Sequence, residues 1–153
     1  MEKNGFIPAE ILIPHRRRMQ LIKRVKAMAG NSLQAETTAE EEWPLSREGM
    51  VSSLISAELV AQAVSAWSTL RHGKGATPRI GLLVGIKEAE FSKADIPLRT
   101  PLTVQIEKLY HLENYAVFRG QVNSQKESFC TIIIQVMEPE ETFLATLKAQ
   151  QKS

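Results

Sequence analysis

The segment from Met50 to Leu70 is the longest apolar stretch of the chain, and it constrains the fold more than any other feature. Its alanine, leucine and glutamine residues favour helix, and proline and glycine are absent from residues 51–71. Ser52 or Ser53 is expected to cap the start of the helix, and Gly73 to end it. The segment is too apolar for a surface helix and too interrupted by polar residues to span a membrane. We therefore predict a helix buried in a sheet.

One broad face of this helix is predicted to point inward, formed by Leu54, Ala57, Ala61, Val64 and Trp67 or Ser68. The helix also carries a single acid, Glu58, among residues that otherwise look buried. Glu58 and Gln62 are four residues apart, so their side chains are expected to lie one above the other. Such an acid either lines a pocket, where burial would raise its pKa, or is a partly exposed or arginine-paired helix acid.

The length of 153 residues predicts one domain, with a core at about 11–138 and a tail or short helix at 139–153. A net charge of +2 does not indicate a nucleic-acid-binding protein. A single cysteine, Cys130, excludes an internal disulfide and fits a reducing compartment. The charged N-terminus does not resemble a signal peptide, so a cytoplasmic protein without membrane insertion is expected.

Strands are predicted on both sides of the helix. Residues 18–29 and 32–38 are expected to form a hairpin around Gly30-Asn31. After the helix, alternating and β-branched segments predict strands at 79–91, 102–110, 115–122 and 128–137, the last of them central. Segments 46–49 and 95–101 are expected to be connections. A hairpin, a buried helix and a run of antiparallel strands predict an α+β hot-dog fold, a curled antiparallel sheet wrapped around one central helix.

Three segments resemble motifs of 3-hydroxyacyl-acyl-carrier-protein dehydratases, in the same order and at the same spacing. They are Leu-Ile-Pro-His-Arg at 12–16 with 21–25 downstream, Glu-Leu-Val-Ala-Gln-Ala at 58–63, and 83–91. The Pro-x-Ile-Gly-x-Leu-x-Gly run at 78–85 is similar to dehydratase-like proteins of aryl polyene clusters. The resemblance covers roughly residues 11–138.

In that family, the resemblance implies, a histidine and the helix glutamate line a tunnel between two subunits. Together they remove water from a thioester-linked 3-hydroxyacyl chain. The resemblance assigns Glu58 as the principal catalytic group and the backbone amide of Gly85 as the group that holds the thioester oxygen. Substrate-binding roles are expected for Gln62, Trp43 and Leu54, and no metal or other cofactor is expected.

The histidine of that family lies in the loop before the helix. Its place, counted back from Glu58 without gaps, falls at Pro44, and this chain has no histidine between His15 and His72. His15 is then either a structural histidine that bonds backbone or a replacement catalytic base that reaches Glu58. Trp43 either plugs or floors an acyl tunnel or belongs to the core.

Two classes of function are consistent with these residues. One is an acyl-thioester enzyme, a 3-hydroxyacyl-carrier dehydratase-like protein of fatty acid or polyene-type biosynthesis. A thioesterase is a variant of this class, because a helix acid alone can activate water at a thioester. The other class is a non-catalytic acyl-binding or partner subunit of a dehydratase.

The expected partners are an acyl carrier protein or a coenzyme A thioester. Arg16 to Arg18 either meet the acidic surface of a carrier protein or are simply solvated. A homodimer is expected, because the apolar strands at 80–84 and 129–136 would otherwise offer edges for pairing.

Overall fold

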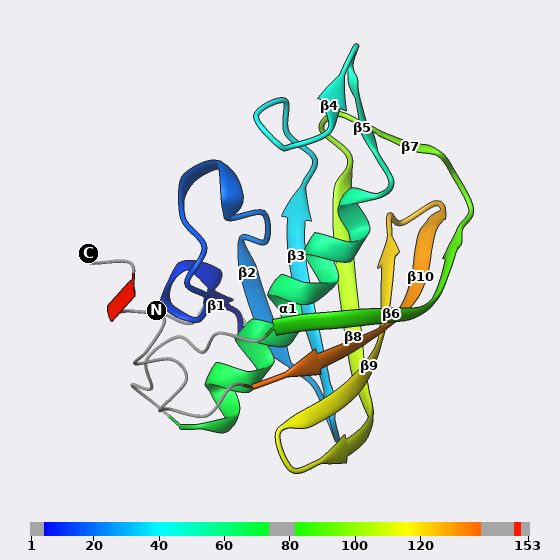
Figure 1. Ribbon diagram of the computed structural model, residues 1–153. Coiled ribbons are helices and arrows are strands. Elements are labelled where there is room, and N and C mark those ends of the chain that lie inside the picture. Colours follow the sequence, from blue (N-terminus) through cyan, green and yellow to red (C-terminus); the bar gives the residue numbers. More distant parts are fainter. Residues whose placement is uncertain (1–4, 74–81, 139–148, 151–153) are drawn as a thin grey trace.

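A seven-stranded antiparallel sheet curls around one long helix, α1 (Ile55–Arg71), in this computed structural model, which describes residues 5–73, 82–138 and 149–150 (Figure 1). The strand order is β1-β2-β3-β8-β9-β10-β6. The strands are β1 (Ile7–Pro8), β2 (Arg24–Ala27), β3 (Ser32–Thr38), β6 (Leu82–Phe91), β8 (Pro101–Leu112), β9 (Tyr115–Asn123) and β10 (Ser128–Met137). The predicted α+β architecture, with a sheet wrapped around one helix, is confirmed.

Short elements complete the described chain. A second, three-stranded sheet joins β4 (Ser46–Arg47), β5 (Met50–Ser52) and β7 (Asp95–Pro97) in the order β4-β5-β7. Two 3-10 helices, η1 (Ala9–Ile11) and η2 (Arg17–Met19), precede β2. No helix among the described residues is long and apolar enough to cross a membrane.

The inner face of the main sheet follows from the alternation of apolar residues along its strands. Strand β8 buries Leu102, Val104 and Ile106, and the neighbouring strand β9 turns Phe118 and Val122 inward. These side chains pack against α1 in one continuous hydrophobic core. The core therefore lies between the concave face of the sheet and the helix.

The contact between α1 and β9 is so close that position 120 requires glycine. A Cβ atom added to Gly120 would lie 2.5 Å from both γ-carbons of Val60. Val60 is β-branched and fully buried, so its side chain has little freedom to turn aside. This contact sets the distance between helix and sheet beside Glu58, which lies two residues before Val60.

Several predicted strand boundaries are corrected. The strand predicted at 18–29 is confined to β2, while its first residues form η2 and an extended segment. The expected connections at 46–49 and 95–101 contain β4 and β7, which pair through β5. Strand β10 has the predicted bounds, but it lies next to the edge strand β6 rather than at the centre.

The helix begins later than predicted, because Met50–Ser52 pairs with β7 as strand β5. Leu54 is the N-cap residue, and its amide donates to Oγ of Ser52 at 3.3 Å. The predicted end of the helix is confirmed: α1 stops at Arg71, and Gly73 has a φ of +97°. Such a conformation favours glycine.

The predicted inward face of the helix is wrong in part. Leu54 is 62% exposed, and Ala57 and Ala61 are only partly buried. The sheet instead covers the sector that contains Ile55, Leu59, Val60, Ala63 and Ala66. Because α1 is apolar on nearly every side, its periodicity does not indicate which sector the sheet covers. The uncovered sector is the one that carries Glu58.

A single domain spanning 1–153 stays a prediction. Of the tail or short helix predicted at 139–153, the described residues are Ala149 and Gln150, which are helical, and the remainder lies outside the described residues.

Candidate functional site

His15 and Glu58 are far apart in the sequence but lie in contact in the fold. Nε2 of His15 is 3.3 Å from Oε1 of Glu58, and the two side chains are 28% and 35% exposed. Both side chains are therefore partly desolvated and still accessible. Nδ1 of His15 is buried and has no hydrogen-bond partner in the described structure. In the neutral tautomer that donates from Nε2, this atom is an unpaired acceptor.

Gln62 connects Glu58 to the segment at residues 19–22 through four hydrogen bonds. Its Nε2 donates to Oε1 of Glu58 at 3.0 Å and to the carbonyl oxygen of Met19 at 2.5 Å. Its Oε1 accepts from the amides of Leu21 at 2.9 Å and Ile22 at 3.3 Å. Gln62 is completely buried. These bonds support a positioning role for Gln62 rather than the predicted contact with substrate.

The same bonds explain why the chain before β2 is not a strand. The amides of Leu21 and Ile22 donate to a helix side chain, so they are not available to a neighbouring strand. Thr37 of β3 adds a bond from its hydroxyl to the carbonyl oxygen of Leu21 at 2.5 Å. The segment that contains His15 is therefore anchored to both the helix and the sheet.

Glu58 is held as a carboxylate. Burial by itself would raise the pKa of Glu58, as the sequence predicted. Hydrogen bonds with His15 and Gln62, together with the charge of His15, outweigh burial and lower the pKa below its usual value of 4.5. The expected upward shift is therefore corrected. At neutral pH the group accepts a proton rather than donating one.

The other three predicted residues form no hydrogen bond or ion pair with His15 or Glu58 among the described residues. Trp43 is 5% exposed and belongs to the hydrophobic core, which supports the core interpretation. Leu54 is exposed at the start of α1. Gly85 lies on β6, opposite Gln135 of β10. The roles predicted for Gly85 and Leu54 stay predictions.

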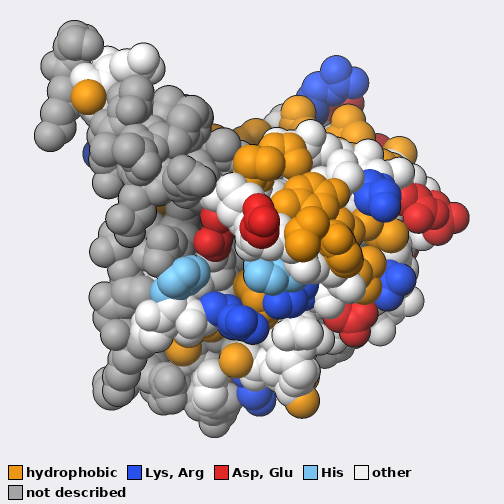
Figure 2. Space-filling model, turned by 60° about the horizontal axis from the view of Figure 1, so that its bottom comes forward, with side chains coloured by type: hydrophobic (Ala, Val, Ile, Leu, Met, Phe, Trp, Pro, Cys, Tyr) orange, Lys and Arg blue, Asp and Glu red, His pale blue; other side chains and the backbone are white. Residues whose placement is uncertain are grey.

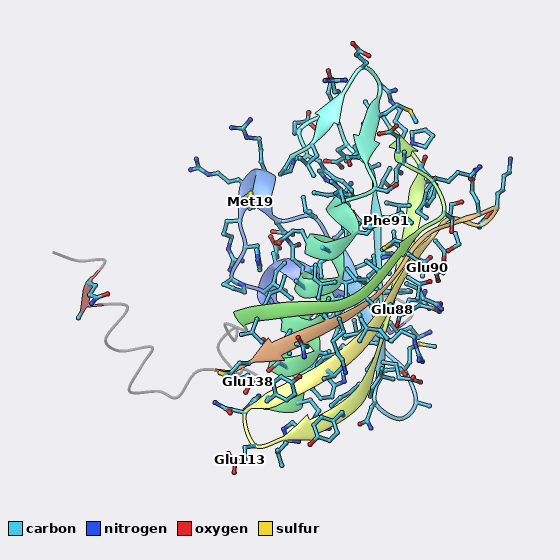
Figure 3. All side chains as sticks on the ribbon, turned by 45° about the vertical axis from the view of Figure 1, so that its right-hand side comes forward. Met19, Glu88, Glu90, Phe91, Glu113 and Glu138 are labelled. Atoms are coloured by element: carbon cyan, nitrogen blue, oxygen red, sulfur yellow. The ribbon has the colours of Figure 1, made fainter. Side chains whose placement is uncertain are left out.

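Strand β6 has an apolar edge and an uncovered inner face. It is the last strand of the sheet, and its side chains Leu83, Val84, Ile86 and Phe91 are between 40% and 51% exposed. Figure 3 shows Glu88, Glu90 and Phe91 along this strand. No described strand pairs with the outer side of β6, and an apolar edge strand of this length favours pairing with another chain.

A cavity of about 350 Å³ lies along the second half of α1, beginning at Ala61. None of the six predicted site residues lines it. The acyl tunnel predicted beside Glu58 is therefore not this cavity. Among the described residues, no group of three His, Cys, Asp or Glu side chains is placed to hold a metal ion.

One family model matches residues 7–148 of this chain, that of the ApeP-like proteins, described as ApeP dehydratase. No curated protein matches the chain.

Solved structures share the fold. The dehydratase heterocomplex ApeI:P from Xenorhabdus doucetiae matches with a TM-score of 0.78 and 21% identity, over 92% of this chain and 97% of that chain. A virulence protein from Campylobacter jejuni matches with a TM-score of 0.65 and 12% identity, over 87% and 88%. A hypothetical thioesterase with coenzyme A from Streptococcus pneumoniae matches with a TM-score of 0.58 and 13% identity, over 74% and 86%. The fold is the predicted hot-dog fold.

Proposed function

Because this chain belongs to the ApeP-like dehydratase family, we propose that it acts on acyl thioesters at the His15–Glu58 pair. The proposed reaction converts a 3-hydroxyacyl thioester into a 2-enoyl thioester and water, within polyene-type or fatty acid biosynthesis. The single observation that carries this proposal is the 3.3 Å contact between the two side chains on the uncovered side of α1. The chain lacks the loop histidine of related dehydratases, and His15 takes its place.

Glu58 is the proton acceptor in this proposal. Its lowered pKa keeps it ionised, and its carboxylate takes the proton from the carbon next to the thioester carbonyl. His15 in its doubly protonated form gives the proton from Nε2 to the departing hydroxyl, which leaves as water, and His15 is left as a neutral imidazole. An amide of β6 near Gly85 stabilises the negative charge that develops on the thioester oxygen. The second wall of the substrate channel comes from a partner chain.

A dimer formed along β6 supplies that wall. A homodimer and a heterodimer with a related subunit both use the edge strand β6. The exposed apolar side chains of this strand support an interface there. The acyl group arrives on a carrier protein or on coenzyme A. The exposed arginines Arg17 and Arg18 lie on η2, in the segment that follows His15, where they can attract an acidic carrier.

The test compares wild-type protein with Glu58→Gln and His15→Gln on a 3-hydroxyacyl thioester and a 2-enoyl thioester. Each substitution is expected to lower the rate by about 100- to 10,000-fold, the usual contribution of a general acid or base. Glu41→Gln, at an exposed loop acid, is the matched control and should leave the rate unchanged. Equal rates for wild type and Glu58→Gln would overturn the assignment of Glu58.

A second readout separates hydrolysis from dehydration. Release of free thiol from the same substrates, lost in Glu58→Gln, would identify a thioesterase in which Glu58 activates water. Formation of the enoyl product without thiol release supports the dehydratase.

The second candidate is a partner subunit in a heteromeric dehydratase. It is favoured by the missing loop histidine, and the matched structure from Xenorhabdus doucetiae is itself a dehydratase heterocomplex. In this case the purified chain turns over neither substrate, yet it raises the activity of a catalytically complete relative that it binds. Glu58→Gln would then activate that relative as well as wild type does.

A further inference from the structure

The cavity along the second half of α1 has the composition of a separate binding site. Its walls come from α1 and from the ends of β6, β8, β9 and β10, so it lies in one chain. Its volume of about 350 Å³ is in the range of small-molecule pockets, roughly 300–1,000 Å³. Glu58 and His15 do not line it.

The inner wall of this cavity is apolar. Val64, Phe118 and Val136 are buried side chains that face it. Trp67 packs edge-on against Phe118, with ring centroids 5.2 Å apart and an interplanar angle of 75°. This wall suits an aliphatic or aromatic body.

Lys108 lies at a position where its strand otherwise turns apolar residues inward. Along β8, Leu102, Val104 and Ile106 are buried on the concave face, and Lys108 is the next residue in that alternation. It pairs with Phe118 of β9, which is 1% exposed. Lys108 is partly buried at this position, with its side chain on the wall of the cavity.

A second cation meets the same tryptophan. The guanidinium carbon of Arg71 lies 4.9 Å from the ring centroid of Trp67, and Nζ of Lys108 lies 5.0 Å from it. Neither cation forms an ion pair with a carboxylate of the described structure. Both cations therefore lie near the ring that borders the cavity, and either can form a charge-assisted hydrogen bond to an anionic ligand.

Among the described residues that line the cavity, the other titratable groups are His72, His111, Glu113 and Glu138. Nδ1 of His72 is 2.7 Å from the carbonyl oxygen of Ser68, so this nitrogen carries the proton. Glu138 already accepts a hydrogen bond from the hydroxyl of Ser68. Glu113 lies at the hairpin between β8 and β9, at the same end of the molecule as Glu138 (Figure 3).

His111 is the second histidine of the lining. Figure 2 shows histidine, basic and acidic side chains gathered on the face that carries this end of the molecule, next to hydrophobic ones. The two cations beside an apolar wall, Arg71 and Lys108, indicate that the cavity prefers a negatively charged ligand.

We propose that this cavity binds a carboxylate attached to an apolar body. The body packs against Val64, Phe118 and Val136, and the carboxylate lies between Arg71 and Lys108. Charge-assisted hydrogen bonds to the two cations give the preference for an acid over a neutral analogue. The site does not depend on thioester chemistry at Glu58, because the two sets of residues do not overlap.

The test measures calorimetric binding of octanoate and octanol to the full-length protein. Wild type is expected to bind octanoate at least tenfold more tightly than octanol. Arg71→Gln and Lys108→Gln should each weaken octanoate binding by about tenfold and leave octanol binding unchanged. Arg119→Gln is the matched control, because Arg119 is a cation on the outer face of β9 that pairs with Glu107 at 3.4 Å.

Trp67 reports the location of the ligand. A brominated carboxylate should quench its fluorescence, and Trp67→Phe should abolish that part of the quenching while Trp43 remains. Circular dichroism verifies that each variant is folded. Equal affinity for octanoate and octanol, tighter binding of octylammonium, or octanoate binding unaffected by both cation substitutions would overturn the proposal. Failure of wild type to bind millimolar octanoate would do so as well.

Discussion

The side-chain amide of Gln62 donates to Oε1 of Glu58 at 3.0 Å, and this bond connects the buried side of α1 to its open side. Gln62 is completely buried, whereas Glu58 is partly exposed and touches His15. The remaining bonds of Gln62 hold the segment at residues 19–22. One side chain thereby aligns the helix, the N-terminal segment and the candidate catalytic residue Glu58.

Replacing Gln62 by Leu should destabilise the protein by about 3 kcal/mol, because the buried amides of Leu21 and Ile22 lose their acceptor. Urea denaturation measures this loss. Gln62→Glu is the matched variant, since it keeps an acceptor for both amides but places a carboxylate next to Glu58. Its stability should recover as the pH is lowered, because a protonated carboxyl can donate as the amide does. A loss below about 0.5 kcal/mol in Gln62→Leu would contradict the network.

The stability difference between wild type and Glu58→Gln should depend on pH. The pKa of Glu58 is lowered in the folded state, so the unfolded chain binds more protons just below the usual value of 4.5. The stabilisation by the carboxylate is therefore complete above about pH 4.5 and is lost as the pH falls through the folded-state pKa. The effect should be modest and weakened by salt, because the group is partly exposed. Unfolding curves at several pH values measure it, and a constant difference across this range would contradict it.

Gly120→Ala should destabilise the protein by about 1–3 kcal/mol, because the new methyl group collides with the γ-carbons of Val60. Gly85→Ala is the matched comparison. There the only atom that an added Cβ would approach closer than 3.0 Å is Oε1 of Gln135, the far end of a flexible side chain, so the loss of stability should be smaller. Thermal unfolding of both variants checks the order, and the reverse order would mean that α1 does not pack on β9 as described.

Ile86→Lys should prevent dimer formation along β6. Ile86 is 49% exposed on this edge strand, and an ammonium group there cannot be buried against a second chain. Leu112→Lys, at the end of β8 where Leu112 is 57% exposed, is the control. Light scattering should give a dimer for wild type and Leu112→Lys and a monomer for Ile86→Lys. A dimeric Ile86→Lys protein would place the interface elsewhere.

The predicted elements that proved correct have strong local signals. The hairpin around Gly30 and strands β3 and β10 follow from a turn glycine and from β-branched alternation. The strand predicted at 18–29 was wrong in its first half because its backbone amides bind Gln62, a partner distant in the sequence. Local strand propensity does not include hydrogen bonds to side chains that are distant in the sequence.

The candidate site was predictable in part. Glu58 stood out as an acid in an apolar helix. For His15 the sequence left two roles open, a structural histidine and a replacement catalytic base. The cation at Lys108 was missed, although its place in the alternation of β8 is visible in the sequence. A lysine that follows three alternate apolar residues of a strand is the signal that could have found it.

The amino-acid sequence alone determined the fold class, because a single long apolar helix followed by alternating strands has few ways to bury its surface. The sequence also singled out Glu58. Only the tertiary structure decided which sector of α1 the sheet covers and that His15 lies against Glu58. A helix that is apolar all round can present any side to a sheet, and the close contact of Gly120 with Val60 and the bonds of Gln62 select one. That selection brings His15 to Glu58 and leaves the other end of α1 beside Lys108.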